Sequence, residues 1–118
     1  YTESQLLSAT PHMHLRGKAM RLRAILPDEE EVDLLRGPRY DFYWQLRYRP
    51  AKPLALPART KIVMEAVFDN SPGNKHNPDP RAAVRWGEQS REEMAVALVE
   101  VAIPARLDPA EIFRAKRF

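Results

Sequence analysis

Two of the three histidines in this chain, His12 and His14, are separated by a single residue. Residues two apart in an extended strand lie on the same face, so we expect the two imidazoles side by side, with Met13 on the opposite face. Neutral imidazole is the commonest protein ligand for a transition metal. The pair therefore predicts a metal site, although two half-exposed polar residues on a sheet face are the simpler interpretation of this spacing alone.

A site with two histidines needs further ligands, and the chain offers one more histidine, several carboxylates and four thioethers. His76 lies in an Asn- and Pro-rich stretch that is typical of an exposed loop. Met20 and Met64 fall on the apolar sides of alternating segments, so both are expected in the core. Met94 follows a charged stretch and opens an apolar run, which places it at the entrance of a strand. From the residues alone, core packing remains its favoured role.

The length of 118 residues is enough for one domain with a real hydrophobic core. A composition of 44% apolar and 30% charged residues is typical of a soluble globular chain. The net charge is +3, and the basic runs at residues 16–23 and 114–117 are expected to be solvated faces. Because no aromatic residues are interleaved with these runs, nucleic-acid binding is not expected.

The chain contains no cysteine. Disulfides, zinc ribbons, iron–sulfur clusters, a blue-copper thiolate and a cysteine nucleophile are therefore excluded within it. No apolar run approaches the roughly 18 residues of a membrane span, so membrane insertion is not expected. The sequence starts with tyrosine rather than methionine and without a signal peptide, which we interpret as a piece of a longer protein.

Apolar patterns predict short strands at residues 19–26, 31–35, 42–48, 60–68, 83–86 and 94–103. In the first of these, Met20, Leu22 and Ala24 share one face, as in a half-buried antiparallel strand. The last is a nearly continuous apolar run, which favours a buried central strand.

Proline-rich loops separate these strands, and prolines confine residues 51–58 to edge or loop conformations. Asp108 followed by Pro109 is an N-cap with a first-turn proline, which predicts a short C-terminal helix to about Lys116. Many short strands with turns between them predict an all-β fold, an antiparallel β-sandwich or jelly roll that ends in this helix. We expect all 118 residues to form this single domain.

Four groups of residues carry a resemblance to a known family. They are residues 11–18 (PHMHLRGK), 38–45 (PRYDFYWQ), 69–71 with 77–80 (DNS and NPDP), and 84–89 with 92–94 (VRWGEQ and EEM). In this order and spacing they resemble the C-terminal domain of the copper type II, ascorbate-dependent monooxygenases, above all the bacterial branch. Better-known relatives are peptidylglycine α-hydroxylating monooxygenase and dopamine β-monooxygenase. The combination is far more specific than His-x-His alone.

The resemblance implies a jelly-roll-like β-sandwich that binds one copper ion per chain. Carried over by motif, His12 and His14 are the imidazole ligands and Met94 is the thioether ligand. A thioether favours Cu(I), imidazole serves both oxidation states, and an open position remains for dioxygen or substrate. The implied activity is oxygen activation and hydrogen abstraction from a substrate carbon, in a periplasmic or extracellular protein.

Two departures limit what the resemblance carries over. Polar groups that hold the substrate in the characterised hydroxylases are replaced here by Thr10, Val96 and Leu98, and none of these can pair with a carboxylate. A peptide-acid substrate is therefore in doubt. The hydroxylases also use a second copper on three histidines of a preceding domain, whereas only His76 is left over here. The resemblance thus implies a partner, a preceding copper or haem redox domain in the same or another chain.

Two functional hypotheses follow. The first is the copper-binding domain of a copper-dependent monooxygenase-like protein that acts on a small-molecule substrate. The alternative is a non-catalytic β-sandwich, a structural or interaction module of a larger exported assembly with a weak or absent copper site. The apolar Val96 and Leu98 favour the alternative. An electron-transfer domain of the blue-copper kind is disfavoured because no thiolate is present.

Overall fold

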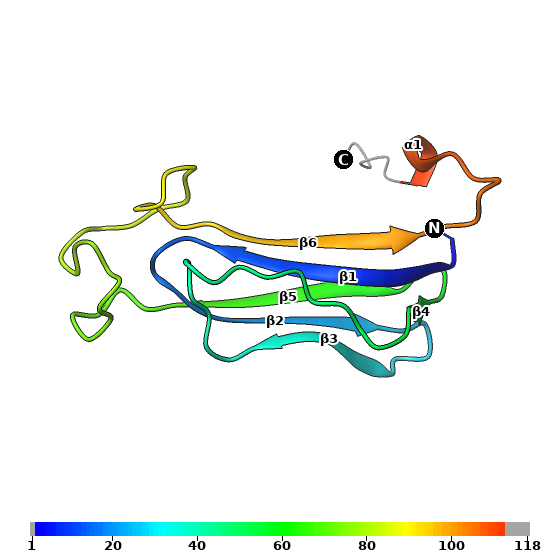
Figure 1. Cartoon of the computed structure of the whole chain (residues 1–118), viewed down its shortest axis with the longest axis horizontal. Helices are drawn as coiled ribbons and strands as arrows, with labels where there is room; N and C mark the ends of the chain where they lie inside the picture. The colour runs from blue at the N-terminus through cyan, green and yellow to red at the C-terminus, as the bar shows by residue number, and fades with distance from the viewer. Residues whose placement is uncertain (1, 113–118) are drawn as a thin grey trace.

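The computed structural model describes residues 2–112, and strands dominate it (Figure 1). In chain order the elements are β1 (Ser4–Met13), β2 (Gly17–Ile25), β3 (Glu31–Gly37), β4 (Leu54–Leu56), β5 (Lys61–Phe68), β6 (Ala95–Ala102) and the single turn α1 (Pro109–Ile112). The strands form two antiparallel three-stranded sheets, ordered β4-β1-β6 and β3-β2-β5. The predicted all-β sandwich is confirmed.

The core lies between the two sheets and is built from their middle strands, β1 and β2. Its fully or nearly buried apolar side chains are Leu6, Ala9 and Met13 of β1, Met20, Leu22 and Ala24 of β2, Leu35 of β3 and Leu56 of β4. Leu6, Ala24 and Leu56 pack together as one cluster, and Ala9, Leu22 and Leu35 as a second. The alternation predicted for residues 19–26 is confirmed, because every second side chain of β2 enters this core.

The hairpin predicted at residues 19–35 is also confirmed. Leu22 of β2 lies opposite Leu35 of β3, and the connecting turn closes through a hydrogen bond from Leu26 N–H to the Glu30 carbonyl at 2.8 Å. Glu29 holds the left-handed backbone conformation, with φ of 68°, that such a tight reversal needs.

The apolar run at residues 94–103 forms β6, but the prediction that it is a central strand is wrong. Its only strand partner among the described residues is β1, so β6 is an edge strand. Leu98 and Val99 are 62% and 43% exposed. Each sheet has three strands with β1 or β2 in the middle, so no strand within residues 2–112 pairs with the far edge of β6. A continuous apolar sequence does not by itself reveal how many strands flank it.

One side of the sandwich is open, at the edge formed by β5 and β6. Met64 of β5 lies opposite Leu22 and faces inward, yet it is 38% exposed, so its expected core position is only partly realised. Ile62 of β5 and Val99 of β6 line a shared pocket of about 250 Å³ at this edge. The inner faces of the two edge strands are therefore accessible to solvent.

The strand predicted at residues 42–48 does not form. Asp41 turns the chain instead, because its carboxylate accepts from Tyr43 N–H at 2.9 Å and its carbonyl from Trp44 N–H at 3.0 Å. Only Tyr48 pairs with β1, through two 2.9 Å backbone bonds with Ala9. The strand predicted at residues 83–86 is likewise reduced to one bridge, from Trp86 to Glu93.

The proline-rich segment and the C-terminal turn follow the expected local chemistry. β4 is a three-residue edge strand, in which Leu56 lies opposite Ser4 of β1. The Asp108 carboxylate accepts from Ala110 N–H at 2.9 Å at the start of α1. The rest of the predicted helix, to about Lys116, lies outside the described residues. Within residues 2–112, no helix is long and apolar enough to cross a membrane.

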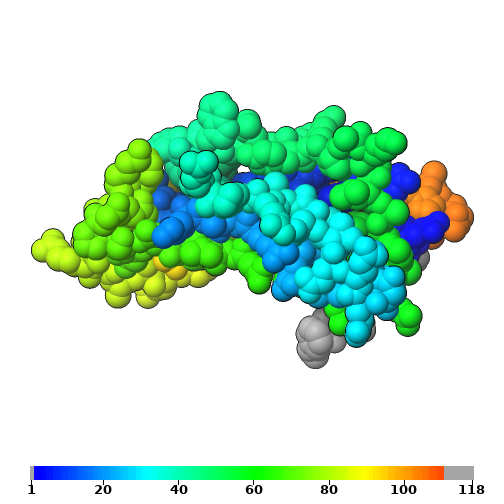
Figure 2. Space-filling view, turned by 90° about the horizontal axis from the view of Figure 1, so that it is seen from below, coloured from blue at the N-terminus to red at the C-terminus, as the bar shows by residue number. Residues whose placement is uncertain are grey.

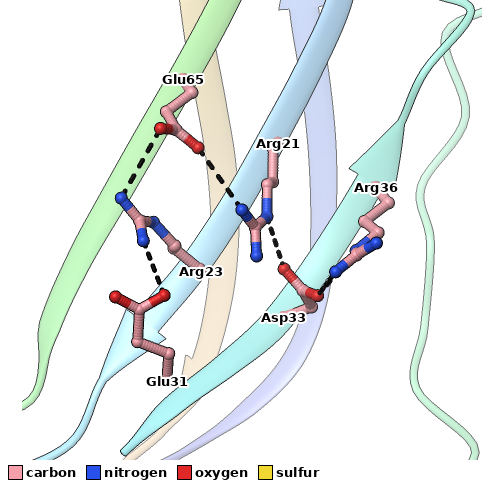
Figure 3. A network of polar contacts seen from close by, with 6 residues as sticks. All are labelled: Arg21, Arg23, Glu31, Asp33, Arg36 and Glu65. Carbon is pink, nitrogen blue, oxygen red and sulfur yellow. Dashed lines mark hydrogen bonds and ion pairs between the residues drawn. The ribbon is translucent and has the colours of Figure 1, made fainter. Parts of the chain in front are cut away.

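The outer face of the β3-β2-β5 sheet carries a ladder of ion pairs (Figure 3). Its members are Arg21 and Arg23 of β2, Glu31, Asp33 and Arg36 of β3, and Glu65 of β5. Arg21 Nε lies 2.7 Å from Asp33 Oδ1, and Arg23 Nη1 lies 2.6 Å from Glu31 Oε2. The basic residues of β2 are thus matched by carboxylates on a solvated face, as expected for Arg21 and Arg23.

Candidate metal centre

The two histidines lie side by side at the end of β1. Their ring centroids are 5.2 Å apart and their planes are inclined by 88°. Met13, between them in sequence, is fully buried in the core, which confirms that the imidazoles share the opposite face. His14 is itself buried, whereas His12 is half-buried.

A tight turn fixes the backbone next to the imidazole pair. Gly17 N–H donates to the His14 carbonyl at 2.8 Å, which closes the corner between β1 and β2. A Cβ atom at Gly17 would lie 2.6 Å from Cβ of Met13 and 2.9 Å from Cδ1 of Tyr40. Only glycine allows this close approach, so the turn that carries His14 depends on it.

Gln45 sets the tautomer of His12. Nδ1 of His12 lies 2.7 Å from Oε1 of Gln45, and Nε2 of Gln45 donates to the Phe42 carbonyl at 2.8 Å. A carbonyl only accepts, so the nitrogen of the Gln45 amide must face Phe42 and its oxygen must face His12. His12 therefore donates from Nδ1, and in the neutral ring the lone pair available to a metal is on Nε2.

A backbone carbonyl orients the ring of His14 in the same way, through Nδ1. Nδ1 of His14 lies 3.2 Å from the Glu92 carbonyl oxygen, which can only accept, so this nitrogen also carries the proton. Both imidazoles thus donate from Nδ1, which leaves Nε2 as the nitrogen that a neutral ring offers to a metal. Metal-binding histidines almost always donate their other ring N–H to a carbonyl, carboxylate or water, and this contact orients the ring toward the metal.

Met94 lies at the same end of the β1–β6 pair. In the register, Val96 is opposite His12 and Ala95 is opposite Met13, so Met94 comes next in line, beside His14. Continuing the alternation of β6 by one residue, Met94 and Val96 fall on the same face as the two histidines. Met94 is half-buried. The register of β1 and β6 therefore places Met94 at the same end of the sheet as the two histidines.

Three consecutive carbonyls, those of Ser90, Arg91 and Glu92, bind the turn that follows β1; we call them the carbonyl clamp. Ser90 O accepts from Leu15 N–H at 3.3 Å, Arg91 O accepts from the Arg16 guanidinium, and Glu92 O accepts from His14. Residues more than 70 positions apart in sequence are held together in this way.

Arg16 is buried, 2% exposed, so the prediction that it belongs to a solvated basic face is wrong. Besides the Arg91 carbonyl, its guanidinium donates to Asn70 Oδ1 at 2.9 Å and to the Asp79 carbonyl at 3.2 Å. The irregular segment between β5 and β6 surrounds the guanidinium, and polar acceptors replace water around its charge.

Tyr40 forms hydrogen bonds with the backbone of Met13, between the two histidines. Its hydroxyl donates to the Met13 carbonyl at 2.6 Å and accepts from Met13 N–H at 2.8 Å. Burial raises the pKa of the Tyr40 phenol, so the donor is retained through neutral pH. Sequence reasoning assigned no role to Tyr40 or Gln45, although both lie in residues 38–45, one of the four segments that carry the family resemblance.

His76 is linked to the imidazole pair only through aromatic rings. It contacts Tyr43 at a centroid distance of 5.9 Å, Tyr43 contacts Phe42 at 5.3 Å, and Phe42 contacts His14 at 6.4 Å. Within residues 2–112, no three His, Cys, Asp or Glu side chains are grouped closely enough to share a metal ion. The third ligand that the family resemblance implies is the Met94 thioether, a donor outside these four residue types.

The surface next to the imidazole pair is largely apolar. Thr10 lies opposite Leu98 on the face that His12 shares with Val96, and Leu98 is strongly exposed. In the space-filling view, the segments coloured for residues 40–50 and 70–85 both adjoin the blue N-terminal strands (Figure 2). The hydrogen bonds of His12 to Gln45 and of His14 to the Glu92 carbonyl place the pair between two irregular segments.

Comparison with models of known families, with curated proteins and with solved structures found no match to this chain. The case for a metal therefore depends on the donor set itself. Two imidazoles oriented through Nδ1 and one thioether form a set of borderline and soft donors, which suits copper in both common oxidation states. The residues fit a copper ion.

Proposed function

We propose that this chain is the copper-binding domain of a copper-dependent monooxygenase-like protein. One copper ion per chain is held by His12, His14 and Met94. The observation that carries the proposal is the adjacent pair of imidazoles, each held at Nδ1 by an acceptor oxygen, so that in neutral rings both Nε2 atoms are available to a metal at one end of the sheet. When bound, copper supplies one-electron redox chemistry toward dioxygen.

The chain's own residues orient the ligands and shape the approach to them. Gln45 and the Glu92 carbonyl hold the two rings, and Tyr40 holds the peptide groups between them. Val96 and Leu98 present an apolar surface on the same face. This surface favours a small substrate bound through its hydrocarbon part over one bound through a carboxylate.

The proposal includes a redox partner. Net oxygen insertion needs two electrons from outside, and a single copper cycling between Cu(I) and Cu(II) supplies one. His76 is the only remaining histidine, so these residues cannot supply a second three-histidine copper site. The partner is a copper or haem domain in the same or another chain, and the proposed setting is the periplasm or the extracellular space.

The alternative function, a non-catalytic module of a larger exported assembly, also has a supporting observation. Large apolar side chains of β5 and β6 are exposed along the open side of the sandwich, among them Ile62, Met64 and Val99. An exposed apolar strip of this kind is typical of a contact surface. The alternative requires no copper site, so metal binding separates the two functions.

A copper titration tests the proposal. The purified chain is titrated with Cu(I) and Cu(II) against competing chelators, and we expect one tightly bound ion per chain. His12→Ala and His14→Ala should each weaken binding of both ions, whereas His76→Ala, the matched control, should leave it unchanged. A parent chain that binds no copper, or unchanged affinity in both ligand variants, would overturn the site and leave the structural module standing.

A further inference from the structure

Arg16 is a buried cation whose acceptors are all neutral. The guanidinium bonds to two backbone carbonyls and one amide oxygen, and no carboxylate pairs with it among the described residues. Burying a charge in this way is costly unless its hydrogen bonds are well formed. A simple packing role would be served by an apolar side chain, so the charge and its planar donors need another explanation.

The guanidinium joins three parts of the segment between β5 and β6 to the turn after β1. Its acceptors are Asn70, Asp79 and Arg91, which lie near the start, the middle and the end of that segment. The segment has little other regular pairing, since its one backbone bridge joins Trp86 to Glu93. A planar fork can reach several acceptors at fixed angles, which the point charge of lysine cannot do.

The last of these acceptors belongs to the carbonyl clamp. Arg91 O binds Arg16, the next carbonyl binds Nδ1 of His14, and Met94 follows two residues after Glu92. The two imidazoles come from β1 and its turn, whereas the thioether comes from the segment before β6. Arg16, two residues after His14, therefore links the turn that carries His14 to the segment that leads to Met94.

We propose that Arg16 is a positioning residue that sets the placement of the Met94 thioether relative to the imidazoles of His12 and His14. It does so by fixing the carbonyl clamp against the turn after β1. This inference rests on the proposed copper site and deepens it, because it identifies what controls the third ligand. Arg16 itself does not bind the metal.

The test compares Arg16→Met, Arg16→Lys and the parent protein. In Arg16→Met we expect copper affinity to fall by about 10- to 100-fold, the range found when outer-shell partners of metal ligands are removed. X-ray absorption of the Cu(I) form should lose its sulfur scatterer while imidazole scattering persists. Arg16→Lys should recover only part of the affinity. Arg21→Met, on the outer face of the other sheet, is the matched control and should bind copper like the parent.

A second variant covers the case in which Arg16→Met does not fold. Asn70→Leu removes the acceptor of Arg16 Nε, and the hydrogen bonds of Asn70 go to Arg16, Ala82 and Asn77 rather than to a histidine. The variant should therefore weaken the sulfur contribution in a protein that still folds. Folding of each variant is checked by circular dichroism and thermal unfolding. Sulfur scattering and copper affinity equal to those of the parent, in either folded variant, would overturn the inference.

A measurement without metal separates this inference from the proposed function. Leu15 N–H donates to Ser90 O in the clamp, so its hydrogen exchange in the metal-free protein should be faster in Arg16→Met than in the parent and in Arg21→Met. If the parent binds copper but Leu15 exchanges at the same rate in Arg16→Met as in the parent, the clamp mechanism alone is overturned. A parent that binds no copper would overturn the proposed function, and the positioning role with it.

Discussion

Nδ1 of His12 lies 2.7 Å from Oε1 of Gln45, a residue 33 positions away in sequence. The two residues lie across the edge of β1 that is not paired with β6. Ala9 bridges Tyr48 on that edge, and three steps along each segment lead from this bridge to His12 and Gln45. The Phe42 carbonyl fixes which end of the Gln45 amide faces the ring. A side chain outside the strand thus determines which nitrogen of His12 is available to a ligand.

Gln45→Leu should therefore weaken copper binding. Without its acceptor, Nδ1–H of His12 loses a hydrogen bond, and the ring is free to rotate or to move its proton to Nε2. We expect a drop of about 10- to 100-fold in Cu(II) affinity, measured by competition titration. Gln45→Glu, which keeps an acceptor oxygen, should retain most of the affinity, and Gln5→Leu at the far end of β1 should have no effect. Equal affinities for Gln45→Leu and the parent would contradict the role assigned to Gln45.

Replacing Met94 should affect one oxidation state more than the other. A thioether stabilises Cu(I) more than Cu(II), so Met94→Leu should weaken Cu(I) binding more strongly. The fold should persist because leucine and methionine have similar volumes. X-ray absorption of the reduced protein should show a sulfur scatterer that is absent in Met94→Leu and present in Met64→Leu, a control on β5. Absence of sulfur scattering in the parent would remove Met94 from the site.

Tyr40→Phe should destabilise the domain. The variant leaves Met13 N–H and C=O without their hydroxyl partner next to a buried side chain. We expect the free energy of unfolding to fall by about 1–3 kcal/mol, the typical cost of an unsatisfied buried polar group. Urea unfolding measures it. Tyr43→Phe, whose ring is 72% exposed, is the control and should change the stability by less than about 0.5 kcal/mol. A loss of unfolding free energy no larger than that of the control would contradict the stabilising role assigned to the Tyr40 hydroxyl.

Acid should remove a contribution that Asp33 makes to stability. Hydrogen bonds from Arg21 and then Arg36 hold the pKa of the Asp33 carboxyl below its usual value. The unfolded carboxyl titrates near pH 3.9, so the contribution is complete above that pH and is lost as the pH falls through the lower pKa of the folded state.

Urea unfolding between pH 6 and pH 2 tests this dependence. Asp33→Asn should be less stable than the parent at pH 6, and the difference should shrink as the pH approaches 2. Glu88→Gln, in an exposed loop, should track the parent across the range. If the difference in unfolding free energy between Asp33→Asn and the parent stays constant with pH, the charge of Asp33 does not contribute to stability.

The sequence allowed the strands to be placed where period-two alternation was unambiguous. Met20, Leu22 and Ala24 alternate with arginines, and this pattern has one physical solution, a strand with one face buried. The position of β6 within its sheet could not be predicted, because neighbours are chosen by topology rather than by the strand itself. At residues 42–48, high β-propensity was overridden by the turn that Asp41 initiates.

The candidate site, too, could be predicted from the sequence only in part. The shared face of His12 and His14 follows from their spacing and is confirmed by the ring contact. The partners of the rings could not be predicted, since Gln45 and Glu92 are distant in sequence and the Glu92 contact uses a backbone carbonyl, which every residue type has. Burial of Arg16 was missed because an arginine among other basic residues is usually solvated, and only long-range contacts with carbonyl oxygens reverse that preference.

The edge position of β6 has a consequence for the behaviour of the isolated chain in solution. Within residues 2–112 no strand pairs with the second edge of β6. Over residues 95–102 this strand has Glu100 as its single charged residue and contains no proline. Natural proteins guard such edges with lysine, proline or a bulge, because an unguarded edge recruits further strands. At high concentration, copies of this chain will therefore tend to aggregate through β6, and a single lysine at Val99 should raise its solubility without touching the histidines.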